Sequence, residues 1–297
     1  MRPEIEQVVQ LIRRKDPKFL DEALGLLQKT VFSFSMKVCG QKQDAEDTMQ
    51  EVLIKSVPNL PKFDNPKALM VWLYKVAKNR CLMSRRKSKF APKQALSLEE
   101  LMPDQREMKR FSDRPVETPE TALLRRDNAR RLREAVQKLP PDYRLVLVLR
   151  DMEELSDDDV ADIMGLKPGT VRVRLHRARL FVRKELEKQV PKFVPSKLLV
   201  PPAPALVKPR ERSCKEMFAE LSNYLDNELD ASLCAELEKH MSRCAPCKAF
   251  LNTLDRAIEL CRATPNELPD PRVCAEMRRA LLTEYQGVLA NINRPSR

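Results

Sequence analysis

The sequence predicts an all-α protein built from several helical modules. Apolar residues recur at helical spacing along most of the chain. The 297 residues include 23 prolines but only five glycines, which is typical of helices joined by proline-marked connections. Residues 155–184 carry the start, turn and restart signals of a helix-turn-helix. A chain of this length exceeds one typical domain, so we expect two or three.

The formal net charge of +12 is unevenly distributed along the chain. Residues 1–212 hold 44 basic and 30 acidic residues, whereas residues 213–297 hold 11 and 13. Residues 1–212 are therefore expected to bind a polyanion, whereas residues 213–297 are not. No apolar run is long enough to span a bilayer, and no charged-then-apolar leader follows Met1, so we expect a soluble cytoplasmic protein with no membrane partner.

The first third of the chain predicts packing helices. Residues 4–40 show helical periodicity twice, with Asp16-Pro17 as the break. Asp44 is placed to cap a third helix, which leaves Gln50 and Glu51 on its outer face.

Residues 67–89 mix aromatic and basic side chains. The only tryptophan, Trp72, lies here, and nine basic residues occur between Asp64 and Glu99 without an acid. Such a mixture suits a strand-separated nucleic acid, because bases stack on rings while phosphates pair with cations. An alternative is that Trp72 is simply a core residue. The interleaved cations are Lys75, Lys78, Arg80, Arg85, Arg86 and Lys87.

Residues 88–118 have weak periodicity and several prolines, which predicts a linker. Helical periodicity resumes at Leu123, and Pro140-Pro141 opens the next helix. With the helix-turn-helix that follows, these helices predict a compact second domain.

The helix-turn-helix is predicted from local signals. Ser156 is an N-cap followed by three aspartates that oppose the helix dipole, Gly165 permits a sharp turn, and Pro168 restarts the helix. In the second helix an inward apolar stripe is formed by Val171, Leu175, Ala178 and Val182, and the opposite face by Arg172, Val173, His176 and Arg177.

This second helix has the charge of a DNA-binding element. No acid occurs from Ile163 to Lys184, so the helix presents a cationic surface suited to a major groove. The alternative is an ordinary helical hairpin with a solvated basic face.

Three motifs together resemble regions 2 and 4 of the extracytoplasmic-function bacterial sigma factors. They are DAEDTMQEVLIKSV, WLYKVAKNRCLMSRRK and LPPDYRLVLVLRDMEELSDDDVADIMGLKPGTVRVRLHRAR, in that order. The resemblance implies that bacterial RNA polymerase core and promoter DNA are the partners. It also implies that residues 44–57 dock on the clamp helices of the largest polymerase subunit through Asp47, Gln50 and Glu51.

The same resemblance assigns the promoter contacts. Residues 58–90 would melt and read the −10 element, with Asn79 at a base-contacting position. At a −35-reading position, Val173 replaces the family's common serine, which exchanges a hydrogen bond for an apolar contact. The predicted DNA-binding residues are Trp72, Lys75, Lys78, Asn79, Arg80, Arg85, Arg86, Thr170, Arg172, Val173, His176 and Arg177.

The C-terminal third contains a candidate zinc site, structural or regulatory. His240, Cys244 and Cys247 form H-x3-C-x2-C, with the first two one helical turn apart. Cys214 is the expected fourth ligand, because Cys234 lies about 120° around the helix from His240. Clustered cysteines beside a histidine favour metal binding in a reducing compartment, although buried free thiols are an alternative.

The segment around this site, with its LSNYLDNEL hairpin, resembles the zinc-binding anti-sigma domain. The resemblance implies a regulator fused to its own target. The proline-rich connector before it could span roughly 60 Å, which allows an intramolecular contact with the sigma modules. A last amphipathic helix is predicted with one face formed by Met277, Leu281, Tyr285, Val288 and Ile292.

Five segments are therefore expected: sigma region 2 (1–90), a linker (91–119), sigma region 4 (120–190), a proline-rich linker (191–212) and a zinc-binding anti-sigma-like domain (213–297). The predicted function is a sigma factor whose fused domain modulates its activity in cis. Two alternatives are a conventional helix-turn-helix regulator with a metal- or redox-sensing tail, and a zinc-dependent adaptor with silenced DNA modules. An enzyme is not expected, because neither histidine is part of a nucleophile or acid-base constellation.

Overall fold

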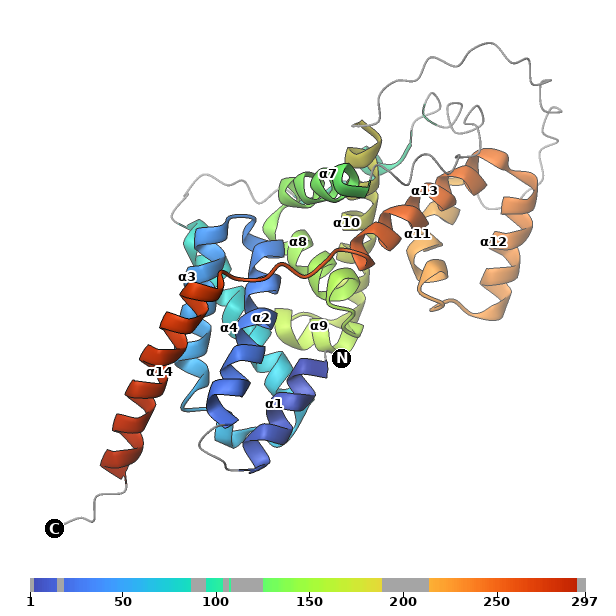
Figure 1. The fold of residues 1–297 in the computed structure, drawn as a ribbon. Coiled ribbons are helices and arrows are strands. Elements are labelled where there is room, and N and C mark those ends of the chain that lie inside the picture. The colour runs from blue at the N-terminus through green and yellow to red at the C-terminus, as the bar shows by residue number, and fades with distance from the viewer. Residues whose placement is uncertain are drawn as a thin grey trace. The chain divides into compact units, whose positions relative to one another are not determined.

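The computed structural model describes residues 3–14, 19–86, 95–103, 107, 125–188 and 214–292. These residues form helices and no strand, which confirms the all-α prediction (Figure 1). None of the helices in these ranges is long and apolar enough to cross a membrane. The predicted linker 191–212 lies outside the described residues, as does most of 91–119.

The chain forms two compact units. The first comprises Met1–Ala95, Val136–Leu175 and Cys261–Arg297, and the second comprises Leu96–Ala135 and His176–Leu260. Each unit therefore combines segments that are distant in the sequence.

The first unit is organised around α2 (Phe19–Cys39), which packs against α1 (Pro3–Arg14), α3 (Lys42–Ser56) and α4 (Pro66–Arg86). Every residue of α2 from Thr30 to Cys39 is buried, because neighbouring segments cover this helix on all sides. The ring of Phe34 packs on that of Tyr74 in α4, with centroids 4.7 Å apart.

The third helix begins earlier than the sequence suggested. Its N-cap is Gln41, without a side-chain cap hydrogen bond, and Asp44 lies in the first turn instead of capping it. Gly40 has a φ of +75°, a left-handed conformation that ends α2 and turns the chain directly into α3.

The helix-turn-helix also belongs partly to the first unit. It is preceded by α8 (Pro141–Leu147) and the π-helical turn η3 (Val148–Met152), both of which pack against α2, and its first helix α9 (Asp157–Met164) packs against α4. As predicted, the Ser156 Oγ accepts a hydrogen bond from the Asp159 N–H at 3.2 Å, and Gly165 ends α9 with a φ of +68°.

The second helix of the motif, α10 (Pro168–Lys188), contributes to both units. Its residues up to Leu175 belong to the first unit and those from His176 to the second. The predicted inward stripe of Val171, Leu175, Ala178 and Val182 is buried.

The last helix, α14 (Pro271–Ile292), packs against α2 in the first unit. The Gln28 Nε2 donates a hydrogen bond to the Cys274 carbonyl oxygen at 3.0 Å. On the predicted amphipathic face Leu281 is buried and Met277 half-buried. The side chains of Tyr285, Val288 and Ile292 lie outside the described set.

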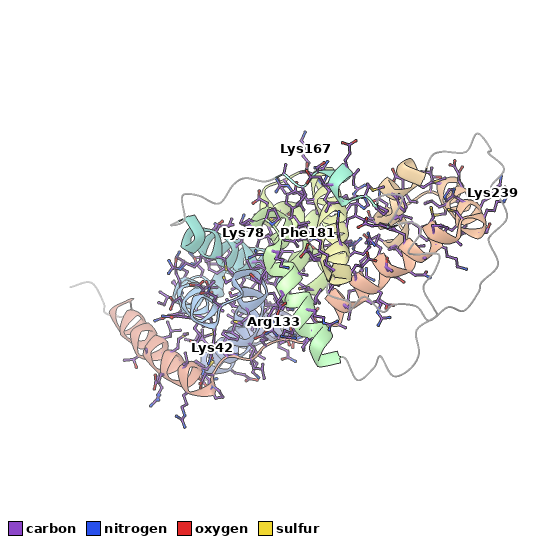
Figure 2. The ribbon with its side chains drawn as sticks, turned by 90° about the horizontal axis from the view of Figure 1, so that it is seen from above. Lys42, Lys78, Arg133, Lys167, Phe181 and Lys239 are labelled. Carbon is purple, nitrogen blue, oxygen red and sulfur yellow. The ribbon has the colours of Figure 1, made fainter. Side chains whose placement is uncertain are left out.

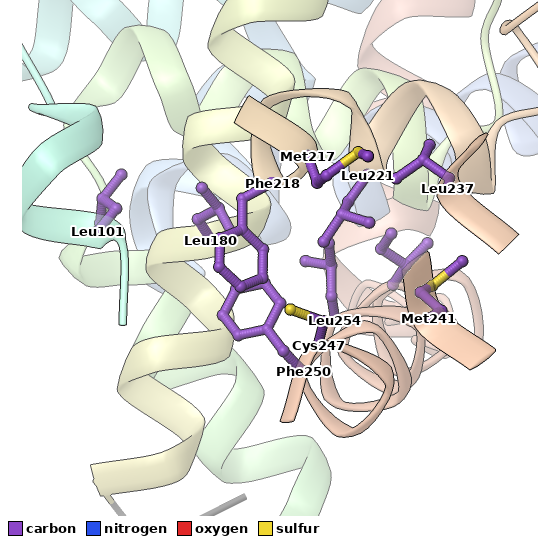
Figure 3. Close-up of a cluster of buried hydrophobic side chains, with 11 residues drawn as sticks. Leu101, Leu180, Met217, Phe218, Leu221, Leu237, Met241, Cys247, Phe250 and Leu254 are labelled. Atoms are coloured by element: carbon purple, nitrogen blue, oxygen red, sulfur yellow. The ribbon is translucent and has the colours of Figure 1, made fainter. Parts of the chain in front are cut away.

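The second unit comprises α11 (Cys214–Leu225), α12 (Ala231–Arg243), α13 (Ala245–Arg262) up to Leu260, the second half of α10, α7 (Arg125–Lys138) up to Ala135 and the short α5 (Leu98–Leu101). Its core is a cluster of buried side chains in which Leu180 of α10 lies with Phe218 of α11 and Phe250 of α13 (Figure 3). The two phenylalanine rings are 4.5 Å apart. Phe181, labelled in Figure 2, is half-buried against the same cluster.

Candidate nucleic-acid interface and metal centre

One face of α3 is open to solvent. Asp47 and Gln50 are exposed, Glu51 is partly exposed, and Ile54 is 46% exposed. These positions follow helical i, i+3, i+4, i+7 spacing, so they share one face. The predicted polymerase contacts thus form a surface that other described residues leave accessible.

Glu51 joins this face to α4. Its two carboxylate oxygens pair with Lys55 at 2.7 Å and with Arg80 at 2.9 Å. The hydrogen bond from Lys55 is the main cause that lowers the pKa of Glu51, so the carboxyl stays ionised at neutral pH.

The predicted DNA-binding residues of α4 lie in different environments. Lys75 and Asn79 are exposed, whereas Trp72 is half-buried and packs on Phe63 with ring centroids 5.6 Å apart. The side chains of Arg85 and Arg86, at the end of α4, lie outside the described set.

Two lysines of α4 are engaged by the helix-turn-helix. The Nζ of Lys78 (Figure 2) donates to the Ile163 carbonyl oxygen at 2.7 Å, and the pKa of Lys78 is lowered by burial. Lys67 pairs with Asp159 at 2.8 Å. Burial raises the pKa of Asp159, but hydrogen bonds with Lys67 and Ser156 outweigh it and the net shift is downward. Both lysines are therefore occupied by residues of α9.

The first turns of α10 present an accessible surface. Thr170 is exposed and Val173 is 51% exposed. Arg172 is also exposed and pairs with Asp157 at 3.2 Å, while Arg177 is half-buried.

His176 is buried, whereas the sequence predicted it on the face of the helix opposite the inward apolar stripe. It is 8% exposed, and its Nδ1 lies 2.8 Å from the Ser222 Oγ of α11. Burial, aided by Arg179 and Arg177, lowers its pKa to about 4, so the ring is neutral at pH 7. In this arrangement His176 cannot reach a base.

Arg179 and Arg183 of α10 are buried, although the sequence predicted a cationic surface along this helix. Arg179 forms two hydrogen bonds to the Asp226 carboxylate, at 2.6 and 3.0 Å, and both side chains are at most 5% exposed. The guanidinium of Arg183 lies 3.9 Å from the centroid of the Phe250 ring. Bidentate pairing and ring stacking are the geometries for which arginine is suited.

A second buried polar network, also missed by sequence reasoning, lies in the first unit. Lys37 of α2 pairs with Glu153 at 2.9 Å, and the Tyr74 hydroxyl donates to the same carboxylate at 2.6 Å. The Lys37 Nζ also donates to the Asn266 Oδ1 at 3.1 Å. The network thus joins α2, α4, the residue after η3 and the segment that precedes α14.

The metal candidates converge as predicted for three of the four ligands. The ligand atoms of His240, Cys244 and Cys247 lie within 4.8 Å of one another, and the His240 Nε2 is 3.2 Å from the Cys247 Sγ. Cys244 ends α12, so the chain turns there and returns Cys247 to the first turn of α13. The side chain of Cys214, which opens α11, is outside the described set.

Comparison with known proteins agrees with this arrangement. The Sigma-70 region 2 model matches residues 25–90, the Sigma-70 region 4 model matches residues 129–182, and a zinc-finger family model matches residues 214–248.

Several sigma factors are similar to this chain. The RNA polymerase sigma-H factor of Pseudomonas aeruginosa is 30% identical over 186 residues, which cover 61% of this chain and 93% of that protein. The factor SigW of Bacillus subtilis is 27% identical over 182 residues, with coverage of 61% and 96%. The sigma-E factor of Escherichia coli K12 is 30% identical over 140 residues, with coverage of 46% and 70%. The chain therefore belongs to the extracytoplasmic-function sigma factors of the sigma-70 family, with a zinc-finger-like anti-sigma domain fused after its region 4.

Proposed function

We propose that this chain binds the core of bacterial RNA polymerase and directs it to specific promoters, while its C-terminal domain controls access to the DNA-binding helices. The observation that carries the first part is the presence of both sigma regions on one chain with sigma-factor relatives. In this proposal residues 1–90 serve as region 2, 120–190 as region 4 and 213–297 as the regulatory domain. Residues 91–119 and 191–212 serve as connections.

Polymerase binding is assigned to the exposed face of α3. Asp47, Gln50 and Glu51 are accessible there. The two carboxylates can attract a basic clamp surface of the polymerase over a distance, and all three side chains can then contact it. The exposed Ile54 adds apolar area to the same face.

Promoter binding is assigned to α4 and α10. The exposed Lys75 and Asn79 suit contacts with a melted strand, and the accessible Arg172 and Val173 suit the edges of bases in a major groove. The remaining predicted contacts are Trp72, Lys78, Arg80, Arg85, Arg86, Thr170, His176 and Arg177.

Zinc is the metal that this donor set favours. One imidazole and two thiols grouped within 4.8 Å fit a tetrahedral site that needs one more ligand, for which Cys214 is the candidate. A bound ion would hold the corner between α12 and α13. Metal analysis of purified protein should find one zinc per chain, and Cys244→Ser/Cys247→Ser should abolish it.

The buried half of α10 supports inhibition in cis. Promoter elements at −35 and −10 are separated by about 25 base pairs, or roughly 85 Å of duplex. The regions that read them must therefore separate, yet α9 packs on α4 and occupies Lys67 and Lys78. Because the regulatory domain is tethered, its effective concentration can reach the millimolar range, so a modest interface suffices to hide His176.

Run-off transcription with core polymerase tests the proposal. We expect Asp226→Ala and a truncation at residue 190 to bind core polymerase as wild type does but to yield more transcript. Asp47→Lys/Glu51→Lys should lose core affinity, while the control Glu6→Lys, an exposed charge reversal on α1, should retain it. Specific binding to duplex DNA without polymerase would favour the conventional helix-turn-helix regulator. Equal amounts of transcript from wild type, Asp226→Ala and the truncated protein would contradict inhibition in cis.

A further inference from the structure

A pair of buried cysteines lies inside region 2, away from the zinc candidates. Cys39 is the last residue of α2 and is 4% exposed, and Cys81 lies in α4 and is 2% exposed. Their sulfur atoms are 2.6 Å apart. The hydroxyl of Thr48, on α3, is 3.8 Å from the Cys81 sulfur.

This spacing fits a disulfide better than a metal site. Two thiolates that share a tetrahedral zinc at about 2.3 Å each would have sulfurs roughly 3.8 Å apart. An S–S bond is about 2.05 Å long, so the sulfurs need to approach by only about half an ångström. We propose that Cys39 and Cys81 form a reversible disulfide that links α2 to α4.

The step is a two-electron oxidation with a peroxide as the oxidant. One thiolate attacks a peroxide oxygen and becomes a sulfenic acid as water leaves, and the second thiol then attacks that sulfur and releases another water. Both thiols are oxidised, one hydrogen peroxide is reduced to two waters, and a dithiol reductant reverses the reaction.

Cys39 is the first thiol to react, because helix ends open more readily than helix interiors. Opening is restrained by region 4: the Gln137 Nε2 donates to the Lys37 carbonyl oxygen at 3.0 Å, and an Arg144 guanidinium nitrogen donates to the Val38 carbonyl oxygen at 2.9 Å. These two bonds cover the last turn of α2. Reaction should therefore be slow while region 4 stays docked.

Peptide mapping of the full-length protein tests the linkage. After treatment with hydrogen peroxide and alkylation of the remaining thiols, a cross-linked peptide containing Cys39 and Cys81 is expected, and dithiothreitol should remove it. The oxidised protein should melt at a higher temperature than the reduced protein. Complete alkylation of both residues, under conditions that oxidise Cys244 and Cys247, would overturn the proposal.

Variants test the order of attack. In Cys81→Ser, Cys39 should accumulate as a sulfenic acid that dimedone traps, whereas in Cys39→Ser, Cys81 should remain mostly a thiol. The control Cys274→Ser removes another buried thiol of the same unit and should leave the linkage unchanged. Equal trapping at both positions would contradict Cys39 as the attacking thiol.

Discussion

At the scale of single residues, the burial of His176 on α10 should depend on whether its imidazole is protonated. His176 has a pKa lowered to about 4, mainly by burial, and its Nε2 has no hydrogen-bond partner among the described residues. An exposed imidazole titrates near pH 6.5. In the proposed inhibition in cis, we therefore expect acidification to favour the open form, in which α11 has left α10 and His176 is exposed, over the closed form, in which His176 is buried. The contribution of the neutral His176 to the free energy of the closed form is full above about pH 6.5, and it is smaller by roughly 1.4 kcal/mol at pH 5.5.

This dependence can be measured on the residue itself. The chain has two histidines, so NMR titration can separate their imidazole signals. We expect His176 to titrate near pH 4 in the wild type and near its ordinary value in Asp226→Ala, which exposes the ring. Ordinary titration in the wild type would contradict the burial of this side chain.

The Arg179–Asp226 pair should be strongly coupled. Removal of either partner leaves a buried charge, which costs about 3–5 kcal/mol, whereas loss of both partners costs less. Hydrogen exchange should show reduced protection of α11 in Arg179→Met and recovery in Arg179→Met/Asp226→Leu. The control Arg174→Met, which removes a more exposed pair with Asp142, should change protection by less than about 1 kcal/mol. Equal effects of the two arginine substitutions would contradict this coupling.

The sequence predicted only some of the side chains that α10 buries. Helical spacing correctly identified the buried Val171 and Leu175, because that pattern is local. It could not identify the burial of Arg179 and Arg183, since their partners Asp226 and Phe250 lie more than 40 residues away in the sequence. The convergence of His240, Cys244 and Cys247 was predictable because their spacing in the sequence is short.

At the scale of elements, local signals predicted the helix-turn-helix better than the helix boundaries elsewhere. Ser156 and Gly165 act as caps through their own backbone and side chain, so neighbouring residues suffice to predict them. The start of α3 was wrong because Gly40 turns the chain, which makes a cap at Asp44 unnecessary. The π-helical turn η3 carries no distinct apolar period and was not predicted.

The cap of α9 should matter measurably for the whole motif. Ser156→Ala removes the hydrogen bond to the Asp159 N–H and should destabilise the protein by about 1 kcal/mol in denaturant unfolding. Ser156→Thr keeps a hydroxyl that can both accept from the Asp159 N–H and donate to the Asp159 carboxylate, and it serves as the control. Unchanged stability in Ser156→Ala would show that water replaces the cap without cost.

At the scale of the whole molecule, the closed first unit depends on contacts that no local pattern contains. Lys37 and Glu153 are 116 residues apart in the sequence, and the network they form also includes Asn266. Periodicity predicted most of the helices in regions 2 and 4, but the packing of region 4 on region 2 depends on three segments that are distant in the sequence. Their polar side chains, moreover, look like ordinary surface residues in the sequence.

Substitution of Lys37 should open this unit instead of unfolding it. Lys37→Met removes the cation that neutralises the buried Glu153 carboxylate, which keeps its hydrogen bond from Tyr74, and this should cost about 3–5 kcal/mol. The carboxylate can reach water if α8, η3 and α9 leave α2 and α4, so release of region 4 relieves the cost while both modules stay folded. Small-angle scattering should show a larger radius of gyration, and transcript yield should rise, with helical content unchanged.

The control Lys37→Met/Glu153→Leu removes both charges and should restore the closed state. Cooperative loss of helix in Lys37→Met would show instead that region 2 cannot fold without this pair.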